Sequence, residues 1–274
     1  MKKVNISLKK YTKIKTGGQA LFFCPENLDD IKNIPKNIKV IGNGSNILCE
    51  DKDYSFLNLN LLNSIFLKDN ILTVYSGVKC STLLRFLLNN NLSGLEFLSG
   101  IPGNTGGIVC MNAGSYGEEI GNYIKKVIYF DVKNWQIKEC ENNGDLFKYR
   151  KSVFNSDKIV LYVVFKELEK AENQNIKNKI NDNFKRKLKT QPVLKHTFGS
   201  VFKNPVNISA WKLLSNSKIQ GKCKGDACFS RKHANFIENK GNALFTDIKY
   251  LIEKAKEKVY NDTEIKLEEE VIYM

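Results

Sequence analysis

The sequence predicts an α+β protein, and three features of its hydrophobic pattern lead to that prediction. Short β-branched and aromatic runs alternate with amphipathic stretches up to about residue 170. Apolar residues then recur every four positions from Ile176 to Leu188, the spacing of one helix face. The last residues alternate between apolar and polar, as in a strand with one buried face.

In the first part of the chain, where short strands and helices alternate, three strands and one helix are the clearest elements. The strands are expected over 71–78, 126–132 and 159–165, where β-branched and aromatic residues dominate. A helix is expected from Ser81, because Leu83, Leu84, Leu87 and Leu88 then share one face.

The second part is expected to be mainly helical and to end in a strand. A helix over 176–188 is followed by a second apolar face around Trp211 and a third helix that Thr246 caps. A strand over 265–273 turns Leu267 and Val271 to one face and Glu268 and Glu270 to the other. The polar stretch 166–175 is the strongest candidate boundary, and we expect three parts: 1–56, 57–172 and 173–274.

The chain is strongly basic, with a net charge of +14 and a pI near 9.3. Such a charge is typical of proteins that bind nucleic acid, anionic lipid or a phosphorylated ligand. The lysines are spread along the whole chain, however, and no basic block is interleaved with aromatics. We therefore favour a general enrichment in lysine and expect no nucleic-acid partner, with salt-sensitive nucleic-acid binding as the alternative.

The cysteines, histidines and termini limit the class of protein further. Seven cysteines without a Cys-x-x-Cys pair indicate reduced, buried thiols. The chain has only two histidines and no ligand spacing, so we expect no metal site. The N-terminus lacks the apolar core of a secretory signal, and no run is long enough to span a membrane. A cytoplasmic protein without a membrane partner is expected.

Two glycine-rich segments carry the functional signal. VIGNGSNIL, residues 40–48, sets small residues between two apolar runs, so its backbone amides can approach a phosphate. Alone it is also compatible with a hairpin turn. Residues 94–120 contain many glycines interleaved with apolar residues, which favours a backbone packed against a large flat ligand with a pyrophosphate. An unusually tight set of turns is the alternative.

The order GLEF, SGIPG, GG, MNAG, YG and E within 94–120 resembles the UDP-N-acetylenolpyruvoylglucosamine reductase family. KYRKSVF (148–154), FGSVFKNP (198–205), residues 210–239 and KLEEEV (266–271) resemble later blocks of the same family. The likeness extends from about Thr16 to Val271 and matches the shorter subtype without a tyrosine-bearing lid. This chain stops soon after Glu270-Val271, where the family usually continues.

The resemblance implies a fold and a reaction. The fold is an FAD-binding domain of the vanillyl-alcohol-oxidase (PCMH) type, with subdomains 1–56 and 57–172, followed by a C-terminal α+β substrate domain over 173–274. The reaction is NADPH-dependent reduction of UDP-N-acetylglucosamine enolpyruvate to UDP-N-acetylmuramate through non-covalent FAD, in peptidoglycan precursor synthesis. The expected partners are this UDP-sugar and NADPH, and the protein is expected to be a monomer.

The resemblance also assigns residues. Arg150 would bind the substrate carboxylate, and Ser200 would protonate the enolate. Glu270 would either assist polarisation of the substrate carboxyl or position the proton. Tyr116, Lys203, Asn204 and His233 would contact the substrate. The expected FAD-binding residues are Gly42, Asn43, Gly44, Ser45, Asn46, Gly100, Ile101, Pro102, Gly103, Gly106, Gly107, Ala113 and Gly114. An oxidase of alcohols or sugars with the same FAD-binding fold and a flavin-binding protein without catalysis remain the rival predictions.

Overall fold

The structure is a computed structural model that describes all residues, 1–274. The chain forms two compact units that are interleaved in sequence. Unit 1 comprises residues 1–4, 21–43 and 55–185, and unit 2 comprises residues 5–20, 44–54 and 186–274. The three-part division at residues 56 and 172 cuts the chain differently and stays a prediction.

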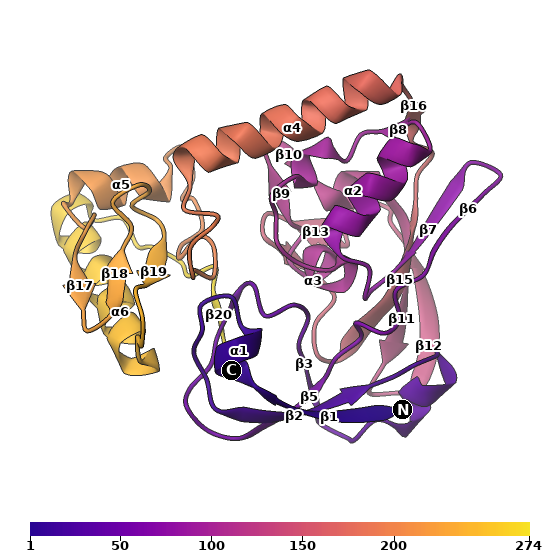
Figure 1. Ribbon diagram of the computed structural model, residues 1–274, viewed down its shortest axis with the longest axis horizontal. Coiled ribbons are helices and arrows are strands. Elements are labelled where there is room, and N and C mark those ends of the chain that lie inside the picture. The colour runs from indigo at the N-terminus through magenta and orange to yellow at the C-terminus, as the bar shows by residue number, and fades with distance from the viewer. The chain divides into compact units, whose positions relative to one another are not determined.

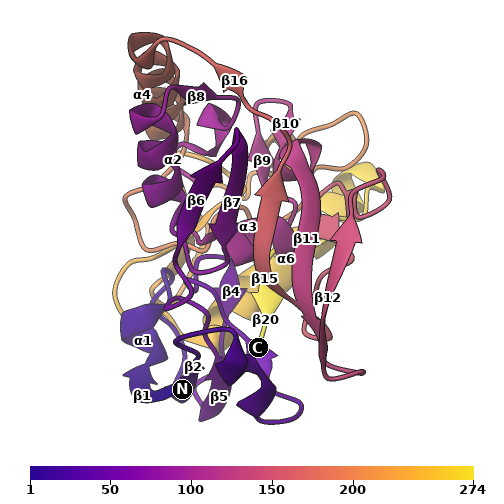
Figure 2. The same ribbon diagram turned by 90° about the vertical axis from the view of Figure 1, so that its right-hand side faces the viewer.

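The centre of unit 1 is a five-stranded sheet in which every neighbouring pair is antiparallel. The strands lie side by side in the order β12-β11-β15-β7-β6 (Figure 2). They are β6 (Ile65–Lys68), β7 (Ile71–Tyr75), β11 (Ile124–Asp131), β12 (Gln136–Glu141) and β15 (Lys158–Phe165). The three strands predicted in this region are therefore confirmed, with ends shifted by up to three residues.

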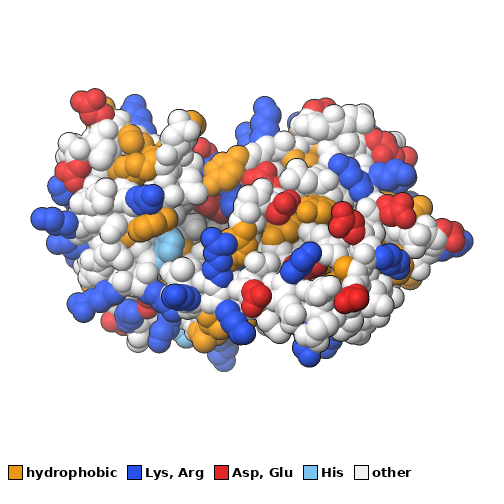
Figure 3. All heavy atoms as spheres, turned by 90° about the horizontal axis from the view of Figure 1, so that it is seen from above, with side chains coloured by type: hydrophobic (Ala, Val, Ile, Leu, Met, Phe, Trp, Pro, Cys, Tyr) orange, Lys and Arg blue, Asp and Glu red, His pale blue; other side chains and the backbone are white.

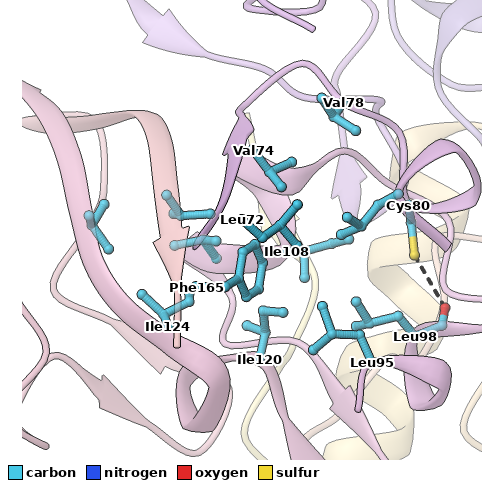
Figure 4. Close-up of a cluster of buried hydrophobic side chains, with 14 of the residues drawn as sticks. Leu72, Val74, Val78, Cys80, Leu95, Leu98, Ile108, Ile120, Ile124 and Phe165 are labelled. Atoms are coloured by element: carbon cyan, nitrogen blue, oxygen red, sulfur yellow. Dashed lines mark hydrogen bonds between the residues drawn. The ribbon is translucent and has the colours of Figure 1, made fainter. Parts of the chain in front are cut away.

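The main core of unit 1 forms where this sheet meets two helices, α2 (Cys80–Asn89) and α3 (Thr105–Cys110). Leu83, Leu84 and Leu87 of α2 are buried in it, which confirms the predicted helix face. Figure 4 shows how Phe165 of β15 points among aliphatic side chains from other elements. In the same core, the Cys80 thiol donates to the carbonyl of Leu98 over 3.3 Å.

Shorter elements complete unit 1. A second sheet has the order β1-β2-β5-β3, and the borders between the two units fall inside β1, β2 and β5. Its strands are β1 (Lys2–Ser7), β2 (Gln19–Cys24), β3 (Lys39–Val40) and β5 (Tyr54–Leu57). Two-stranded pairs are formed by β8 (Leu92–Ser93) with β16 (Glu169–Lys170), β9 (Gly114–Ser115) with β10 (Glu118–Glu119), and β13 (Phe147–Lys148) with β14 (Lys151–Ser152). Single 3-10 turns cover Asp29–Asn33, Glu96–Leu98 and Ile120–Tyr123.

Unit 2 packs two helices and a small sheet around one apolar core. The helices are α5 (Ala210–Asn216) and α6 (Phe245–Thr263), and the antiparallel sheet has the order β17-β18-β19 (Figure 1). Its strands are β17 (Cys223–Lys224), β18 (Ala227–Phe229) and β19 (Ile237–Asn239), and a short helix α1 (Leu8–Tyr11) belongs to the same unit. The predicted apolar face of the third helix is confirmed, since Ile248, Leu251, Ile252, Ala255 and Val259 are all buried.

The amphipathic helix that the four-residue apolar spacing predicts is present. The predicted helix over 176–188 is α4 (Asn173–Thr190), which runs across the border between the units. Ile176 is buried in it, whereas Phe184 is partly exposed. None of the helices has the length and apolarity that crossing a membrane requires.

Three details of the sequence prediction were wrong. Helix α6 starts at Phe245 with Leu244 at its N-cap, so Thr246 lies inside the helix and does not cap it. The last strand is shorter than expected: β20 covers only Ile272–Tyr273 and pairs in parallel with β4 (Ile47–Leu48). Two cysteines, Cys223 and Cys228, are joined by a disulfide because they face each other across β17 and β18. The other five cysteines are free, as expected.

The core of unit 1 generates a first prediction. Phe165→Ala should lower the free energy of unfolding by about 3–5 kcal/mol, because a fully buried aromatic ring is lost and a cavity remains. Phe66→Ala is the matched control; its side chain is exposed, so the expected change is within about 0.5 kcal/mol. Urea unfolding curves of both variants measure the difference. Equal losses would show that Phe165 does not anchor this core.

Candidate active site

The start of the first glycine loop and the second loop meet at Asn104 in unit 1. A Cβ at Gly42 would lie 2.8 Å from Asn104 Oδ1, so a larger residue does not fit at position 42. Asn104 Nδ2 donates to Asn60 Oδ1 over 2.8 Å, and Asn58 Nδ2 donates to the carbonyls of Ile41 and Gly42. Buried asparagines thus fix the backbone of both loops at one point.

The second glycine loop leads into helix α3, and the amides of residues 105–107 already donate hydrogen bonds within the protein. The amides of Thr105 and Gly106 donate to the carbonyls of Val78 and Ser76, and Gly107 N donates to Asn104 Oδ1. A Cβ at Gly106 would lie 3.0 Å from that of Ser76. Gly106 and Gly107 therefore allow close packing and do not offer their own amides to a ligand.

Gly100 and Gly103 determine the backbone direction of the second glycine loop. Their φ angles of +75° and +154° lie in a region that favours glycine. The carbonyl of Gly103 accepts from the amide of Cys80 at the start of α2, and Ile101 N donates to Leu98 O. The chain direction between the two glycines is thus set by the backbone and by its contact with α2.

The rest of the first glycine loop belongs to unit 2. Gly44 has φ +61°, and its carbonyl accepts from the amide of Lys13. Asn46 Nδ2 donates to the carbonyl of Glu270 over 3.0 Å, and Asn46 O accepts from the amide of Ile272. This half of the loop is therefore held by the C-terminal segment.

Arg150 lies in unit 1, in the two-residue turn between β13 and β14. Its Nη2 donates to the carbonyl of Gly114 over 2.9 Å, and its Nη1 lies 3.4 Å from Glu119 Oε1. The guanidinium also lies 4.9 Å from the centre of the Tyr149 ring. The φ angle of +53° at Arg150 is unusual for a residue with a side chain, and such strain is typical of functional sites.

Asn112 and Glu119 support this arginine, and the sequence analysis did not single them out. Asn112 Nδ2 donates to Glu119 Oε2 over 2.7 Å and to the carbonyl of Lys148 over 3.0 Å. Asn112 Oδ1 accepts from the amide of Gly121. Both residues lie in the MNAG and YG-E parts of the glycine-rich segment, so the motif contained the signal that would have identified them.

Tyr116 is at the tip of the β9–β10 hairpin. Tyr116 and Gly117 form the two-residue turn with φ angles of +61° and +91°, the pattern of a type I′ turn. The Tyr116 hydroxyl donates to the carbonyl of Asn183 in α4 over 3.1 Å. Gly114, at the base of the hairpin, has no room for a side chain, because a Cβ would lie 2.0 Å from Glu118 O.

Ser200 and Glu270 come from neighbouring segments of unit 2. Ser200 pairs with Phe236 as an isolated bridge and follows Gly199, whose φ is +91°. The amide of Glu270 donates to the carbonyl of Val201 over 2.8 Å. The structure thus brings together two of the three predicted catalytic residues, while Arg150 belongs to unit 1.

The three consecutive glutamates have different surroundings. Glu268 is exposed and forms an ion pair with Lys203. Glu269 forms an ion pair with Lys256 of α6 over 2.9 Å, and its side chain is only 18% exposed. Strand alternation places Glu269 on the side of Leu267 and Val271, and its low exposure agrees with that placement. Glu270 is half-buried next to Val201.

The other predicted substrate residues of unit 2 lie near the same segments. Lys203 N donates to the carbonyl of Glu268. Asn204 Oδ1 accepts from the amide of Ala210 at the start of α5 over 3.0 Å. His233 packs between the rings of Trp211 and Phe236, with ring centres 6.1 and 4.8 Å away.

The environment of His233 fixes its charge. Burial lowers the pKa of His233 from 6.5 to about 4, although a backbone hydrogen bond partly opposes the shift. Its Nδ1 accepts from the amide of Asn235 over 3.3 Å, so Nδ1 carries no proton. At neutral pH the ring is therefore a neutral group with its proton on Nε2.

Comparisons with known proteins identify the class of protein first. Residues 20–134 match the family described as FAD binding domain. Residues 191–274 match the family described as UDP-N-acetylenolpyruvoylglucosamine reductase, C-terminal domain. The fold and the two glycine loops thus belong to a flavin-dependent oxidoreductase.

Whole-chain relatives identify the family. The chain is 35% identical to the UDP-N-acetylenolpyruvoylglucosamine reductase of Borrelia garinii subsp. bavariensis, over 99% of this chain and 94% of that protein. It is 36% identical to the enzyme of the same name from Carboxydothermus hydrogenoformans, over 96% and 90%. The crystal structure of the enzyme from Thermus caldophilus matches with a TM-score of 0.88 and 29% identity, over 100% of this chain and 99% of that one. The chain belongs to the UDP-N-acetylenolpyruvoylglucosamine reductase family.

Membership of this family confirms the central predictions from the sequence. The fold class is an FAD-binding domain with a C-terminal α+β domain, as expected. The chain is a flavin-dependent oxidoreductase of peptidoglycan synthesis that uses FAD as cofactor and NADPH as co-substrate. The rival predictions, a nucleic-acid-binding protein or an oxidase of the same FAD-binding fold, do not account for a match along the whole chain.

The site generates a prediction about pH. The ring of His233 should titrate with a midpoint near pH 4, because burial disfavours the imidazolium. Since the unfolded state then binds the proton more tightly, His233 should lower stability as pH falls from about 6.5 towards 4. Histidine resonances followed by NMR measure the midpoint, and His196→Gln assigns the two rings. A midpoint at or above 6.5 would contradict a buried, neutral ring.

Proposed function

We propose that the chain reduces UDP-N-acetylglucosamine enolpyruvate with Arg150, Ser200 and Glu270 as its catalytic residues. The observation that carries this proposal is the pairing of two segments in unit 2. The amide of Glu270 donates to the carbonyl of Val201, the residue that follows Ser200 in the neighbouring segment. A proton donor and a carboxylate are thereby supported by one short stretch of backbone.

The glycine loops fit an FAD pyrophosphate. Gly42 has no room for a side chain, and Gly44, Gly100 and Gly103 adopt positive φ, so the backbone itself can approach the ligand. Gly42, Asn43, Gly44, Ser45 and Asn46 would hold it from one loop, and Gly100, Ile101, Pro102, Gly103, Ala113 and Gly114 from the other. Gly106 and Gly107 would support the second loop through packing. Bound FAD supplies the hydride chemistry that links NADPH to the substrate.

Non-covalent binding is part of the proposal. Cys110 is the one cysteine within the second glycine-rich segment, 94–120, and burial raises the pKa of its thiol to about 12. A thiol with such a pKa is protonated at neutral pH and is a weak nucleophile. Cys110 is therefore unsuited to a covalent flavin link.

Arg150 would bind the carboxylate of the enolpyruvyl group. Its Nη2 is fixed by Gly114 O and its Nη1 by Glu119, so the guanidinium has a defined orientation. A guanidinium is planar and can offer paired N–H donors to a carboxylate. Such a donor, in place before the reaction, stabilises negative charge that develops on the substrate as it is reduced.

Ser200 would protonate the carbon that becomes negative, and Glu270 would assist. Gly199 before Ser200 has φ +91° and open space where a Cβ would be, so a ligand can approach the backbone there. Tyr116, Lys203, Asn204 and His233 would contact the UDP-sugar. A neutral His233 would contribute one N–H donor from Nε2 and no charge.

The location and the partners complete the proposal. We expect a cytoplasmic monomer without nucleic-acid or membrane partners. On the face drawn in Figure 3, Lys and Arg side chains are spread out, with Asp and Glu side chains between them. Dispersed charges of both signs favour solubility over a dedicated nucleic-acid surface.

Ser200→Ala tests the proton donor. Reduction of the flavin by NADPH should stay fast, because it needs no proton from Ser200. Turnover with the enolpyruvyl substrate should fall by about 10²-fold or more, the usual effect of losing a positioned acid. Rapid-mixing absorbance of the flavin follows both steps. An equal loss in the two steps would mean that Ser200 has a structural role only.

Glu270→Gln tests the carboxylate, with Glu268→Gln as its matched control. Glu270→Gln keeps the shape and should lower turnover by about 10²-fold or more, with FAD content and melting temperature unchanged. Glu268→Gln should keep near-normal turnover, because its carboxylate is exposed and its ion pair with Lys203 is worth at most about 1 kcal/mol. Steady-state kinetics and thermal melting measure both variants. If only the Glu268→Gln variant were inactive, the catalytic carboxylate would be that of Glu268 and not that of Glu270.

A further inference from the structure

A disulfide closes the hairpin of β17 and β18 in unit 2, outside the predicted catalytic residues. Cys223 and Cys228 are directly opposite each other in the antiparallel register, with Cα atoms 4.1 Å apart. Cys223 is exposed and Cys228 is half-buried. The two sulfurs are therefore paired at the protein surface, where a small molecule can reach them.

Hairpin pairing already brings the two cysteines together. The strands are joined by the short turn at Gly225. Lys224 pairs with Ala227 within the loop that the disulfide closes. A bond that closes so short a loop removes little conformational entropy from the unfolded chain. The disulfide can therefore be reduced and formed again while the rest of unit 2 stays folded.

Both cysteines line a cavity of about 520 Å³. Its charged lining residues are Lys195, Arg231, Lys232, Lys240 and Glu238. Lys232 Nζ donates to the carbonyl of Leu188, and Lys240 forms an ion pair with Glu238. Arg231 packs against Gly221, where a Cβ would lie 3.3 Å from Arg231 Nε.

The cavity is positive at neutral pH. Burial acts to raise the pKa of Glu238, but hydrogen bonds from Lys240 and Ser230 and the charges of Lys240 and Lys195 lower it overall. Glu238 is therefore ionised and offsets one of the four cations. Lys222 and Lys224 lie on either side of Cys223 in the chain, and Asp226 in the turn offsets one of these two charges. An anion is favoured here, and a cation is repelled.

We propose that Cys223 and Cys228 form a thiol–disulfide exchange site whose cavity admits a small anionic thiol or disulfide. The incoming thiolate attacks the more exposed Cys223 sulfur, so a mixed disulfide forms and Cys228 leaves as a thiolate. A second thiolate then attacks the ligand's sulfur, which releases the ligand disulfide and the Cys223 thiolate. Two electrons pass to the protein, and the cysteines take up two protons from water. An anionic disulfide reverses these steps.

The charges of the cavity make the proposal testable in the full-length protein. Glutathione, which is anionic, should reduce the disulfide at least about 10-fold faster than cysteamine, a cationic thiol, after correction for thiolate fraction and intrinsic reactivity. High salt should remove most of this preference, because it screens exposed charges. Samples quenched with acid at set times, followed by intact-mass spectrometry of the protein, measure the two rates at low and high salt.

Matched charge variants distinguish an effect of the cavity's charges from an effect of the protein's overall charge. Lys195→Gln with Arg231→Gln should bring the two corrected rates within about 3-fold of each other, since the attraction is lost. Arg85→Gln with Lys133→Gln removes the same charge from unit 1 and should keep the preference. In Cys228→Ser, the Cys223 thiolate should attack added glutathione disulfide and release one glutathione thiolate, so that intact-mass spectrometry finds one glutathione on Cys223. Equal rates in the unmodified protein, or no adduct on a folded Cys228→Ser variant, would overturn the proposal.

Discussion

The backbone of Glu270 joins three segments of unit 2 that are far apart in sequence. Its amide donates to Val201 O over 2.8 Å, and its carbonyl accepts from Asn46 Nδ2 over 3.0 Å. The hydrogen bonds continue on both sides, from Lys203 N to Glu268 O and from Met274 N to Leu48 O. Since buried backbone groups need partners, these bonds fix the register of the chain end against both neighbours. The orientation of Ser200 and half of the first glycine loop depends on that register.

In unit 1 the corresponding constraint is the turn that carries Arg150. Arg150 and Tyr116 both adopt positive φ, a conformation that costs residues with side chains about 1–3 kcal/mol. The contacts of Arg150 with Gly114 O and Glu119 offset this cost, and Asn112 holds Glu119 in turn. Strain is thus tolerated where it directs a guanidinium, and neighbouring polar groups stabilise it.

The sequence predicted the elements with strong periodicity. The faces of α2 and α6 were correct because their leucines, isoleucines and valines repeat at helical spacing and are buried in the structure. The long β11 and β15 were found for a similar reason, since each is rich in β-branched and aromatic residues. The local hydrophobic pattern was sufficient to predict an element wherever burial of its apolar face in the core determines its structure.

Long-range contacts were the part that the sequence could not supply. The end of the chain was expected to be one long strand, yet β20 covers only Ile272–Tyr273, because its partner β4 is itself two residues long. Before β20, Glu269 pairs with Phe202 only as an isolated bridge. Cys223 and Cys228 meet through the register of a hairpin, which no spacing rule indicated. Glu269 differs from its neighbours because Lys256 of α6 is close to it, a contact that strand alternation cannot reveal. In the candidate site, the motifs supplied the residues, and the structure supplied their supports, Asn104, Asn112 and Glu119.

Two groups of the candidate site, one in each unit, have strongly shifted pKa values, and these determine how the groups respond to pH. Burial keeps His233 neutral, with a pKa of about 4, and keeps Cys110 protonated, with a pKa of about 12. Neither group changes its protonation between about pH 5 and 9, given these values. His233 therefore remains an uncharged N–H donor over that range, which suits its proposed contact with the substrate because no charge has to be desolvated when the substrate binds.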